Sequence, residues 1–298
     1  MLTKSSTELV RQQNSALVLE SLRRHGPLAH TDISQHTGLA SATVSAITAE
    51  LEKADVLERR EQQAAATRGR PRVIFGQRRE AGYLIAVRIS SDMVQYSLAD
   101  YGGTLLDRFE EPRNHADVST EPFAAAFVAA LERLVERSQI RHDDVLVVSI
   151  SSKGLVDSAS ARLVWSPVFG AEHVDFADLL QPAWRAKILV SNETLLVAHA
   201  MASRMEKARM NDLHAVAALS LGHSIGLGIA RFDRMGELTV TAPNFGHMLN
   251  SADGKLCRCG AQGCIEASAG FYGILRTAFE VPPDTIPAKF VPLAEMDK

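Results

Sequence analysis

The most informative part of the sequence comprises Gly246-His247 and the stretch Cys257-Arg258-Cys259-Gly260-Ala261-Gln262-Gly263-Cys264-Ile265-Glu266. It holds all three cysteines of the chain, and its His-x9-Cys-x-Cys-x4-Cys spacing gathers one imidazole and three thiols within 18 residues. Three thiolates and one imidazole are the ligand set of a closed, four-coordinate zinc site. The sequence therefore predicts a structural zinc ion held by His247, Cys257, Cys259 and Cys264.

A disulfide is the alternative use of these cysteines. Cys257 and Cys259 are too close in sequence for an unstrained bridge, and an odd number of cysteines leaves one thiol over. Residues 1–10 show no apolar signal segment, and no apolar run approaches the roughly 18 residues that span a membrane. We therefore expect a cytoplasmic protein without a membrane partner, in a reducing compartment where such clusters more often bind metal.

The charge distribution separates the N-terminal residues from the rest. The chain has 298 residues, enough for two or three domains, and its 46% hydrophobic and 22% charged residues are ordinary for a globular protein. Residues 1–79 carry 12 Lys and Arg against 8 Asp and Glu, whereas the remainder carries 20 against 27. A basic segment on an acidic body favours a module that faces nucleic acid.

The N-terminal pattern predicts a helix-turn-helix. A first helix ends near Gly26-Pro27 and carries an apolar stripe of Leu9, Leu17, Leu19 and Leu22. A short second helix over 31–37 precedes Gly38, which favours a left-handed turn, and Ser41 is expected to cap a third helix over 42–54. The second helix of such a motif enters the DNA major groove.

The third helix divides into a core face and a DNA-facing surface. Val44, Ile47 and Leu51 recur at helical spacing and are expected in the core. The candidate major-groove residues are Ser41, Ala42, Thr43, Ser45 and Thr48.

A wing is predicted after these helices. Two short strands, within 56–60 and 68–75, flank a basic loop whose Arg68, Arg70 and Arg72 suit a narrow minor groove. The alternatives are a solvated linker for the arginines and a generic three-helix packing unit for the helices. Together the features favour a winged helix-turn-helix DNA-binding domain over residues 1–80.

Strands alternate with helices in residues 81–298, which indicates an α/β body. The predicted strands are 83–89, 94–99, 104–110, 145–150, 188–191, 215–221 and 225–232, and the predicted helices are 122–138, 192 to about 207, one starting at 266, and 271–280.

Taken together, these residues resemble the ROK family of sugar-responsive bacterial repressors and sugar kinases. The cysteine stretch matches the family signature Gly-His…Cys-x-Cys-Gly-x-x-Gly-Cys-(Leu/Ile)-Glu, and residues 221–228 stand at its second glycine loop. The N-terminal domain is similar to that of the repressor branch. The resemblance implies an actin-like, two-lobed sugar-kinase fold over 81–298, behind the DNA-binding domain. Because the chain stops soon after residue 280, we expect an incomplete second lobe.

The resemblance also predicts that kinase activity is lost. The family's first phosphate loop, Asp-x-Gly-Gly-Thr, is replaced by Arg88-Ile89-Ser90-Ser91-Asp92, which lacks the glycines that let amides approach phosphate. Glu193 stands at the catalytic Asp, and the second loop keeps Gly222, Gly226 and Gly228 but carries His223-Ser224 where the family has Thr-Gly. We therefore expect a protein that is not an enzyme.

By the same resemblance, a sugar or sugar-phosphate inducer binds beside the zinc. The candidate sugar-binding residues are Asn192, Glu193, Asn244, His247 and Glu266, with Lys153-Gly154 and 166–170 on the far wall. The alternative for Asn192 and Glu193 is that they only cap the helix that begins there.

The sequence as a whole predicts a repressor of sugar-metabolism genes that binds operator DNA as a homodimer or tetramer. A DNA-binding protein with a vestigial sensor is the main alternative, and a sugar kinase is the lesser one.

Overall fold

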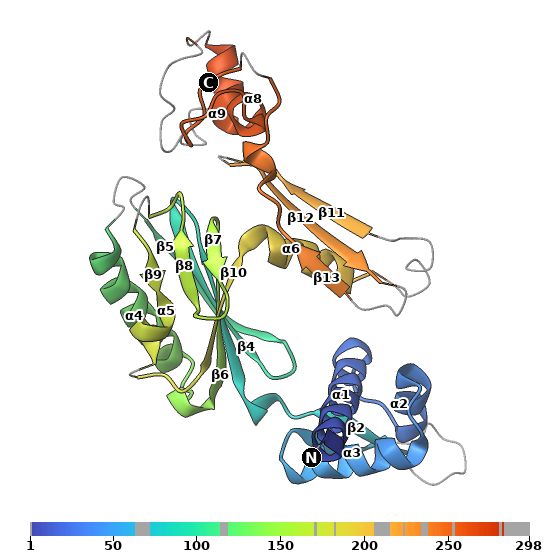
Figure 1. Ribbon diagram of the computed structural model, residues 1–298. Coiled ribbons are helices and arrows are strands. Elements are labelled where there is room, and N and C mark those ends of the chain that lie inside the picture. Colours follow the sequence, from blue (N-terminus) through green and yellow to red (C-terminus); the bar gives the residue numbers. More distant parts are fainter. Residues whose placement is uncertain are drawn as a thin grey trace. The chain divides into compact units, whose positions relative to one another are not determined.

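The computed structural model describes residues 2–62, 72–113, 119–169, 172–181, 183–205, 215–222, 224–233, 238–251, 254–279 and 282 (Figure 1). The chain forms two compact units. One contains residues 1–85, 97–108 and 134–147, and the other contains 86–96, 109–133 and 148–298. The predicted domain boundary at residue 80 stays a prediction.

Three helices and a two-stranded ribbon build the N-terminal part. The helices are α1 (Leu2–His25), α2 (His30–Thr37) and α3 (Ser41–Lys53), and the strands are β1 (Leu57–Gln62) and β2 (Arg72–Gln77). A single apolar core joins all five elements, and its buried members are Val18, Leu22, Ile33, Val44, Ile47, Leu57 and Phe75. Each such side chain stabilises the fold by roughly 1.5–3 kcal/mol when fully buried.

The apolar stripe predicted on α1 is partly wrong. Leu9 and Leu17 are 56% and 47% exposed, whereas Val18 and Leu22 are buried and Leu19 packs at the edge of the core. Val18 and Leu22 lie four residues apart, on one face of the helix. This face packs on the core, so Leu19 and Leu22 of the predicted stripe are confirmed, whereas Leu9 and Leu17 are not part of it and Val18 is.

The turn between α2 and α3 forms as predicted, but the cap does not. Gly38 takes the left-handed conformation with φ 73°, and its amide donates to the Ser34 carbonyl. The N-cap of α3 is Ala40, which has extended backbone and no side-chain cap bond. Ser41 is therefore the first helical residue rather than the predicted cap.

The two predicted strands of the wing are present. β1 and β2 pair antiparallel from Leu57↔Gln77 to Gln62↔Arg72. A bridge between Leu28 and Phe75 ties this ribbon to the segment before α2. The predicted wing loop with Arg68 and Arg70 lies outside the described residues.

A five-stranded sheet with the order β10-β6-β3-β4-β5 lies in the α/β body. Its strands are β3 (Tyr83–Ile89), β4 (Met93–Asp100), β5 (Leu105–Pro112), β6 (Val145–Ser152) and β10 (Lys187–Asn192). Buried and partly buried residues alternate along β4, the pattern of a half-buried strand. The predicted turn after β4 is closed by Asp100, which accepts the Thr104 amide, and by Gly103 with φ 86°.

Helix α4 (Thr120–Arg137) carries aromatic residues into the body. Phe127 meets Phe176 at 5.4 Å and Phe123 meets Phe169 at 4.7 Å between ring centroids. A second, small sheet was not predicted; its strands are β7 (Leu155–Asp157), β8 (Arg162–Trp165) and β9 (Val174–Asp175). Strands of two to four residues are too short to show a periodic pattern.

Helix α6 (Glu193–Ser203) packs on a third sheet of β11 (Ala215–Ser220), β12 (Gly226–Phe232) and β13 (Leu238–Thr241), of which β13 was not predicted. A side chain at Gly226 or Gly228 would overlap Thr194 in α6. These two glycines therefore permit close approach of strand and helix.

The remaining elements are short. They are the 3-10 turns η1 (Arg79–Ala81), η2 (His142–Asp144) and η3 (Phe245–His247), with α5 (Phe176–Leu180), α8 (Ile265–Ala269) and α9 (Phe271–Ala278). Among the described helices, none is both long and apolar enough to cross a membrane.

Candidate metal centre and ligand pocket

The four predicted metal ligands lie together. The ligand atoms of His247, Cys257, Cys259 and Cys264 are all within 4.8 Å of one another. They come from three places in the chain: η3 supplies His247, the loop after residue 254 supplies Cys257 and Cys259, and the residue before α8 supplies Cys264. Sequence spacing therefore identified a cluster that forms in three dimensions.

Close backbone packing shapes the loop that carries the thiols. The Cys257 amide donates to the Ala261 carbonyl at 2.8 Å, which folds the Cys-x-Cys segment into a tight turn. Gly260 and Gly263 have φ values of 89° and 78°, a region that other residues rarely adopt. A side chain at Gly263 would also overlap the Ser251 carbonyl. The glycines are therefore required by the geometry of this cluster.

The distances fit a tetrahedral zinc ion. Cys259 Sγ lies 3.7 Å from Cys264 Sγ, and His247 Nδ1 lies 3.6 Å from Cys257 Sγ. Zinc bonds of ~2.3 Å to sulfur and ~2.0 Å to nitrogen in a regular tetrahedron put sulfurs about 3.8 Å apart and nitrogen and sulfur about 3.5 Å apart. The cysteines are free rather than bridged. The cluster can therefore hold a metal ion, and its ligand chemistry suits zinc.

Burial disfavours the charged thiolate form of two cysteines in this cluster. Cys257 and Cys264 are buried, and burial raises the pKa of Cys257 to about 12. At neutral pH a cation has to displace the proton before this sulfur becomes a ligand.

An arginine from α9 supports the metal loop. Arg276 is 1% exposed, and its Nη1 donates to the Leu256 carbonyl at 3.1 Å while its guanidinium lies over the Tyr272 ring. A buried cation of this kind fixes the backbone directly before Cys257. No sequence pattern indicated this contact.

A cavity of about 580 Å³ adjoins the cluster. His247 and Cys259 line it, together with predicted sugar-binding residues Asn192, Asn244 and Glu266 and predicted wall residues Lys153, Gly154 and Pro167. Its other lining residues include Leu155, Trp165, Thr194, Ser220, Ser224, Ile225, Phe245 and Arg258. Apolar and aromatic walls with a few polar groups are typical of a small-molecule site.

Both polar atoms of the Asn192 side chain have partners within the protein. Oδ1 accepts the Thr194 amide at 2.9 Å and caps α6, and Nδ2 donates to the Gly154 carbonyl at 2.8 Å. The capping alternative for Asn192 is therefore what the contacts show, although Asn192 also lines the cavity.

Glu266 is also held from two sides. Its Oε2 accepts the Ile225 amide at 3.2 Å, and its Oε1 lies 3.3 Å from an Nη of Arg258. A carboxylate can accept further hydrogen bonds, so Glu266 keeps acceptor capacity at the cavity wall.

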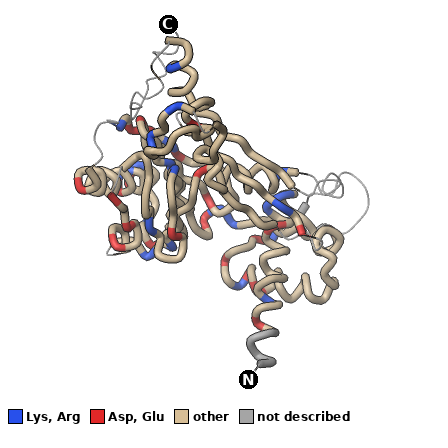
Figure 2. The backbone as a smooth tube through the Cα atoms, turned by 45° about the horizontal axis from the view of Figure 1, so that its top comes forward, with Lys and Arg blue, Asp and Glu red and all other residues tan. Residues whose placement is uncertain are grey.

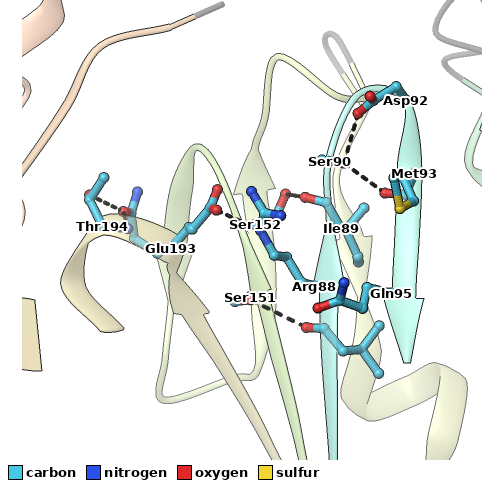
Figure 3. Close-up of polar contacts among 12 residues, drawn as sticks. Arg88, Ile89, Ser90, Asp92, Met93, Gln95, Ser151, Ser152, Glu193 and Thr194 are labelled. Atoms are coloured by element: carbon cyan, nitrogen blue, oxygen red, sulfur yellow. Dashed lines mark hydrogen bonds and ion pairs between the residues drawn. The ribbon is translucent and has the colours of Figure 1, made fainter. Parts of the chain in front are cut away.

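Of the five predicted sugar-binding residues, Glu193 does not line this cavity, whereas the other four do. Glu193 Oε1 accepts from Arg88 Nε at 2.6 Å, as Figure 3 shows. Ser90 and Asp92, which stand where a phosphate loop was sought, are hydrogen-bonded to each other at 2.9 Å. Local contacts therefore engage Arg88, Ser90, Asp92 and Oε1 of Glu193, whereas Oε2 of Glu193 is buried without a hydrogen-bond partner among the described residues.

The candidate DNA-contacting residues of α3 differ in accessibility. Ser41, Ala42 and Ser45 are exposed, and Thr43 is half-buried. Thr48 is 1% exposed, and its hydroxyl bonds to the Val44 carbonyl at 2.9 Å and to His30 Nε2 at 2.8 Å. Thr48 thus belongs to the interior, where its hydroxyl joins α3 to α2, and the assignment as a base-contacting residue is wrong. The Arg72 side chain, like Arg68 and Arg70, is not described.

Several arginines of the N-terminal part are neutralised locally. Arg23 and Arg24 pair with Glu20, Arg59 pairs with Glu52, and Arg60 pairs with Glu58. Figure 2 shows basic positions mixed with acidic ones along the described backbone. The basic excess of residues 1–79 therefore depends on residues such as Arg68, Arg70 and Arg72.

Comparison with known proteins shows to which families the two parts of this chain are similar. The ROK family model matches residues 84–297, most of the chain. The chain belongs to the ROK family. The MarR family model matches residues 12–63, so a MarR-type helix-turn-helix precedes the ROK domain.

The chain spans about two thirds of the length of the curated relatives that it matches. The chain is 24% identical to the xylose repressor of Bacillus spizizenii over 271 residues, 90% of this chain and 68% of the relative. It is 22% identical to the transcriptional repressor Mlc of Escherichia coli, covering 90% of this chain and 66% of Mlc. It is 23% identical to the dual regulator NagC of Escherichia coli, covering 89% of this chain and 64% of NagC. These names agree with the prediction of a ROK regulator rather than a kinase.

Solved structures confirm the fold class. The crystal structure of a ROK family transcriptional regulator, a homologue of the E. coli Mlc protein, aligns with a TM-score of 0.71 and 23% identity, covering 91% of this chain and 67% of that chain. A ROK family glucokinase from Streptomyces griseus, in complex with glucose and AMPPNP, aligns with a TM-score of 0.51 and 27% identity, covering 67% of this chain and 61% of that chain. The body therefore has the actin-like sugar-kinase fold, behind an N-terminal helix-turn-helix.

Proposed function

We propose that this ROK protein is a sugar-responsive transcriptional repressor whose zinc-stiffened pocket binds the inducer. The observation that carries the proposal is that His247 and Cys259 belong both to the metal cluster and to the lining of the cavity. A ligand in this cavity contacts the same residues that hold the metal, so it can move the metal loop. The relatives named as repressors support the regulatory reading.

The cavity suits a carbohydrate. Trp165 and Phe245 offer apolar surface for the faces of a sugar ring, while Asn244, Ser224 and His247 offer hydrogen-bonding groups for hydroxyls. Asn192 and Glu266 act mainly by fixing the wall, because each already has partners. Glu193, which does not line the cavity, is proposed to act on the pocket through its charge, which acts on Lys153.

DNA binding is proposed for α3 and the wing. The exposed residues Ser41, Ala42 and Ser45, with half-buried Thr43, form the major-groove surface of α3. Arg68, Arg70 and Arg72 are proposed to contact the backbone or the minor groove. Pseudo-palindromic operators of such proteins match a two-fold symmetric dimer, which we also propose.

Phosphoryl transfer is the competing function. The described residues do not provide the free base and the glycine loop that this reaction needs. The position of the catalytic base is held by Glu193, whose carboxylate is paired with Arg88, and no glycine cradle follows β3. A reaction needs a free base aligned with the attacked hydroxyl. We therefore propose that ATP is not turned over with any hexose.

A linkage experiment tests the proposal. Operator sequences are selected from a random DNA library, and operator affinity is measured by fluorescence anisotropy with and without each member of a sugar panel. If the pocket regulates DNA binding, a sugar that weakens operator binding by some factor has its own affinity weakened by the same factor in the presence of operator. Equal sugar affinity with and without operator contradicts the coupling, and operator binding without any sugar binding supports the vestigial-sensor alternative.

A further inference from the structure

Lys153 is placed in the cavity by a rigid turn after β6. The next residue, Gly154, has φ 126°, and a side chain there would overlap the Trp165 carbonyl. Asn192 Nδ2 donates to the Gly154 carbonyl at 2.8 Å and holds the turn against α6. The Lys153 side chain therefore starts from a fixed backbone and lines the cavity.

The charges around Lys153 do not balance. Two acids and two arginines act on its ammonium, namely Glu193, Glu266, Arg88 and Arg258. Glu193 is paired with Arg88 at 2.6 Å, and Glu266 is paired with Arg258 at 3.3 Å. Within the described part of the chain, Lys153 itself has neither an ion pair nor a hydrogen bond. The cavity thus contains one positive charge more than its acids compensate.

Such a charge is costly without a partner. Burial lowers the pKa of Lys153, and the nearby Glu193 only partly opposes this effect. An ammonium removed from water needs an anion or several hydrogen-bond acceptors to recover its solvation. A ligand with a negative group can supply this partner.

The surroundings of the ammonium suit an anion. Lys153 Nζ lies 3.9 Å from the place that a Gly222 Cβ would occupy, in the loop that follows β11. Ser220 at the end of β11 and Ser224 in the loop after it also line the cavity, and each carries a hydroxyl group. One ammonium and nearby hydroxyl donors form a site for phosphoryl or carboxylate oxygens.

We propose that the ligand of this cavity is an anionic carbohydrate whose phosphoryl or carboxylate group is bound by Lys153, while the rest of the cavity binds the sugar ring. The inference rests on the proposed sensor function and specifies its ligand class. The paired arginines 88 and 258 do not provide this selectivity, because each is matched by an acid.

Equilibrium binding to the full chain tests the inference. Glucose, mannose and galactose are each titrated beside their 6-phosphates and their uronates, with inorganic phosphate as a separate probe. The same titrations are made with Lys153→Met, which removes the charge at similar length, with Lys153→Arg, which keeps it, and with Lys187→Met, an exposed lysine in β10 that does not line the cavity.

We expect an anionic form to bind at least tenfold more tightly than its parent sugar. Lys153→Met is expected to weaken that form roughly ten- to a hundredfold and to leave the neutral sugar within twofold, since a hydrogen bond to a charged group is lost. Lys153→Arg retains most of the preference, and Lys187→Met changes nothing. Preference for the 6-phosphate or for the uronate identifies the source of the negative charge.

Four results would overturn the inference. Neutral sugars that bind as tightly as their anionic forms, or a Lys153→Met variant that weakens both equally, contradict the anionic ligand but leave the sugar pocket intact. Binding by no sugar of either kind, or by inorganic phosphate alone, contradicts the proposed sugar sensor as well.

Discussion

Arg88 Nε donates to Glu193 Oε1 at 2.6 Å, and this bond joins two positions at which the sequence differs from the pattern expected of a ROK kinase (Figure 3). Arg88 comes from β3, and Glu193 begins α6, 105 residues further along the chain. By the resemblance to ROK kinases, the arginine stands near the place expected for the acid of the phosphate loop, and the glutamate stands at the place expected for the catalytic base. Each substitution therefore compensates the charge of the other.

Removal of this arginine is expected to destabilise the protein. In Arg88→Ala the Glu193 carboxylate, whose side chain is only 14% exposed, loses its counter-ion. Because the Arg88 side chain is half exposed, we expect a modest loss of about 1 kcal/mol in the free energy of unfolding. Urea unfolding of Arg88→Ala, Glu193→Gln and the double variant measures the coupling. Strictly additive effects would show that the pair contributes nothing.

The metal cluster is expected to contain one zinc ion per chain. Cys259→Ser removes an exposed ligand and should abolish zinc retention after dialysis, whereas Gln262→Ala on the same exposed loop should retain it. Elemental analysis measures the metal. A chelator should lower the melting temperature of the parent protein and of Gln262→Ala, but not that of Cys259→Ser. A metal-free protein whose melting temperature ignores chelator would refute the site.

Thr48 and Ser45 are expected to affect different properties although both lie on α3. Thr48→Val leaves His30 Nε2 without its partner in the core and should cost about 1–2 kcal/mol of stability. Ser45→Glu places a negative charge on the exposed surface and should weaken operator binding at least tenfold without a change in stability. Melting curves and fluorescence anisotropy on both variants separate these effects. Reversal of the two outcomes would mean that α3 does not present this surface to DNA.

The glycines at 222 and 228 provide a matched pair. In Gly228→Ala the new methyl group overlaps the Thr194 carbonyl in α6, which should cost about 1–3 kcal/mol. In Gly222→Ala the nearest heavy atom is 3.8 Å away, so stability should be unchanged. Thermal unfolding of both variants checks this difference. Equal stability would indicate that α6 and β12 are not in close contact.

The predicted DNA contacts of the wing arginines can be tested by the salt dependence of operator binding. Arg70→Ala should weaken operator binding and reduce the slope of log affinity against log salt by roughly one, since one phosphate contact is lost. Arg60→Ala is the control, because Arg60 is already paired with Glu58. An unchanged slope for Arg70→Ala places the DNA contacts elsewhere.

The sequence was most informative where the pattern is local. The turn at Gly38, the strand boundaries of β3 and the four metal ligands were predicted from spacing and residue type, and the structure places them accordingly. The predictions that failed concern which residues a side chain contacts. Thr48 was assigned to the surface because of its hydroxyl group, although it lies four residues after Val44 and three before Leu51, on the core face of the helix. In the structure this hydroxyl contacts His30 Nε2 in the interior. Helical periodicity gives a face, but it does not specify what that face meets.

The same distinction applies to the pocket. Residue types within one stretch of chain determined the ROK signature and the capacity to bind metal, because four ligands close in sequence need only a short loop to converge. Only the tertiary structure decided the roles of Asn192, Glu193 and Lys153. Asn192 holds the Gly154 carbonyl, Glu193 is neutralised by Arg88, and Lys153 is left with its charge uncompensated. The partners of these side chains are separated from them by tens of residues, and electrostatic balance depends on distance in space rather than on order in the chain.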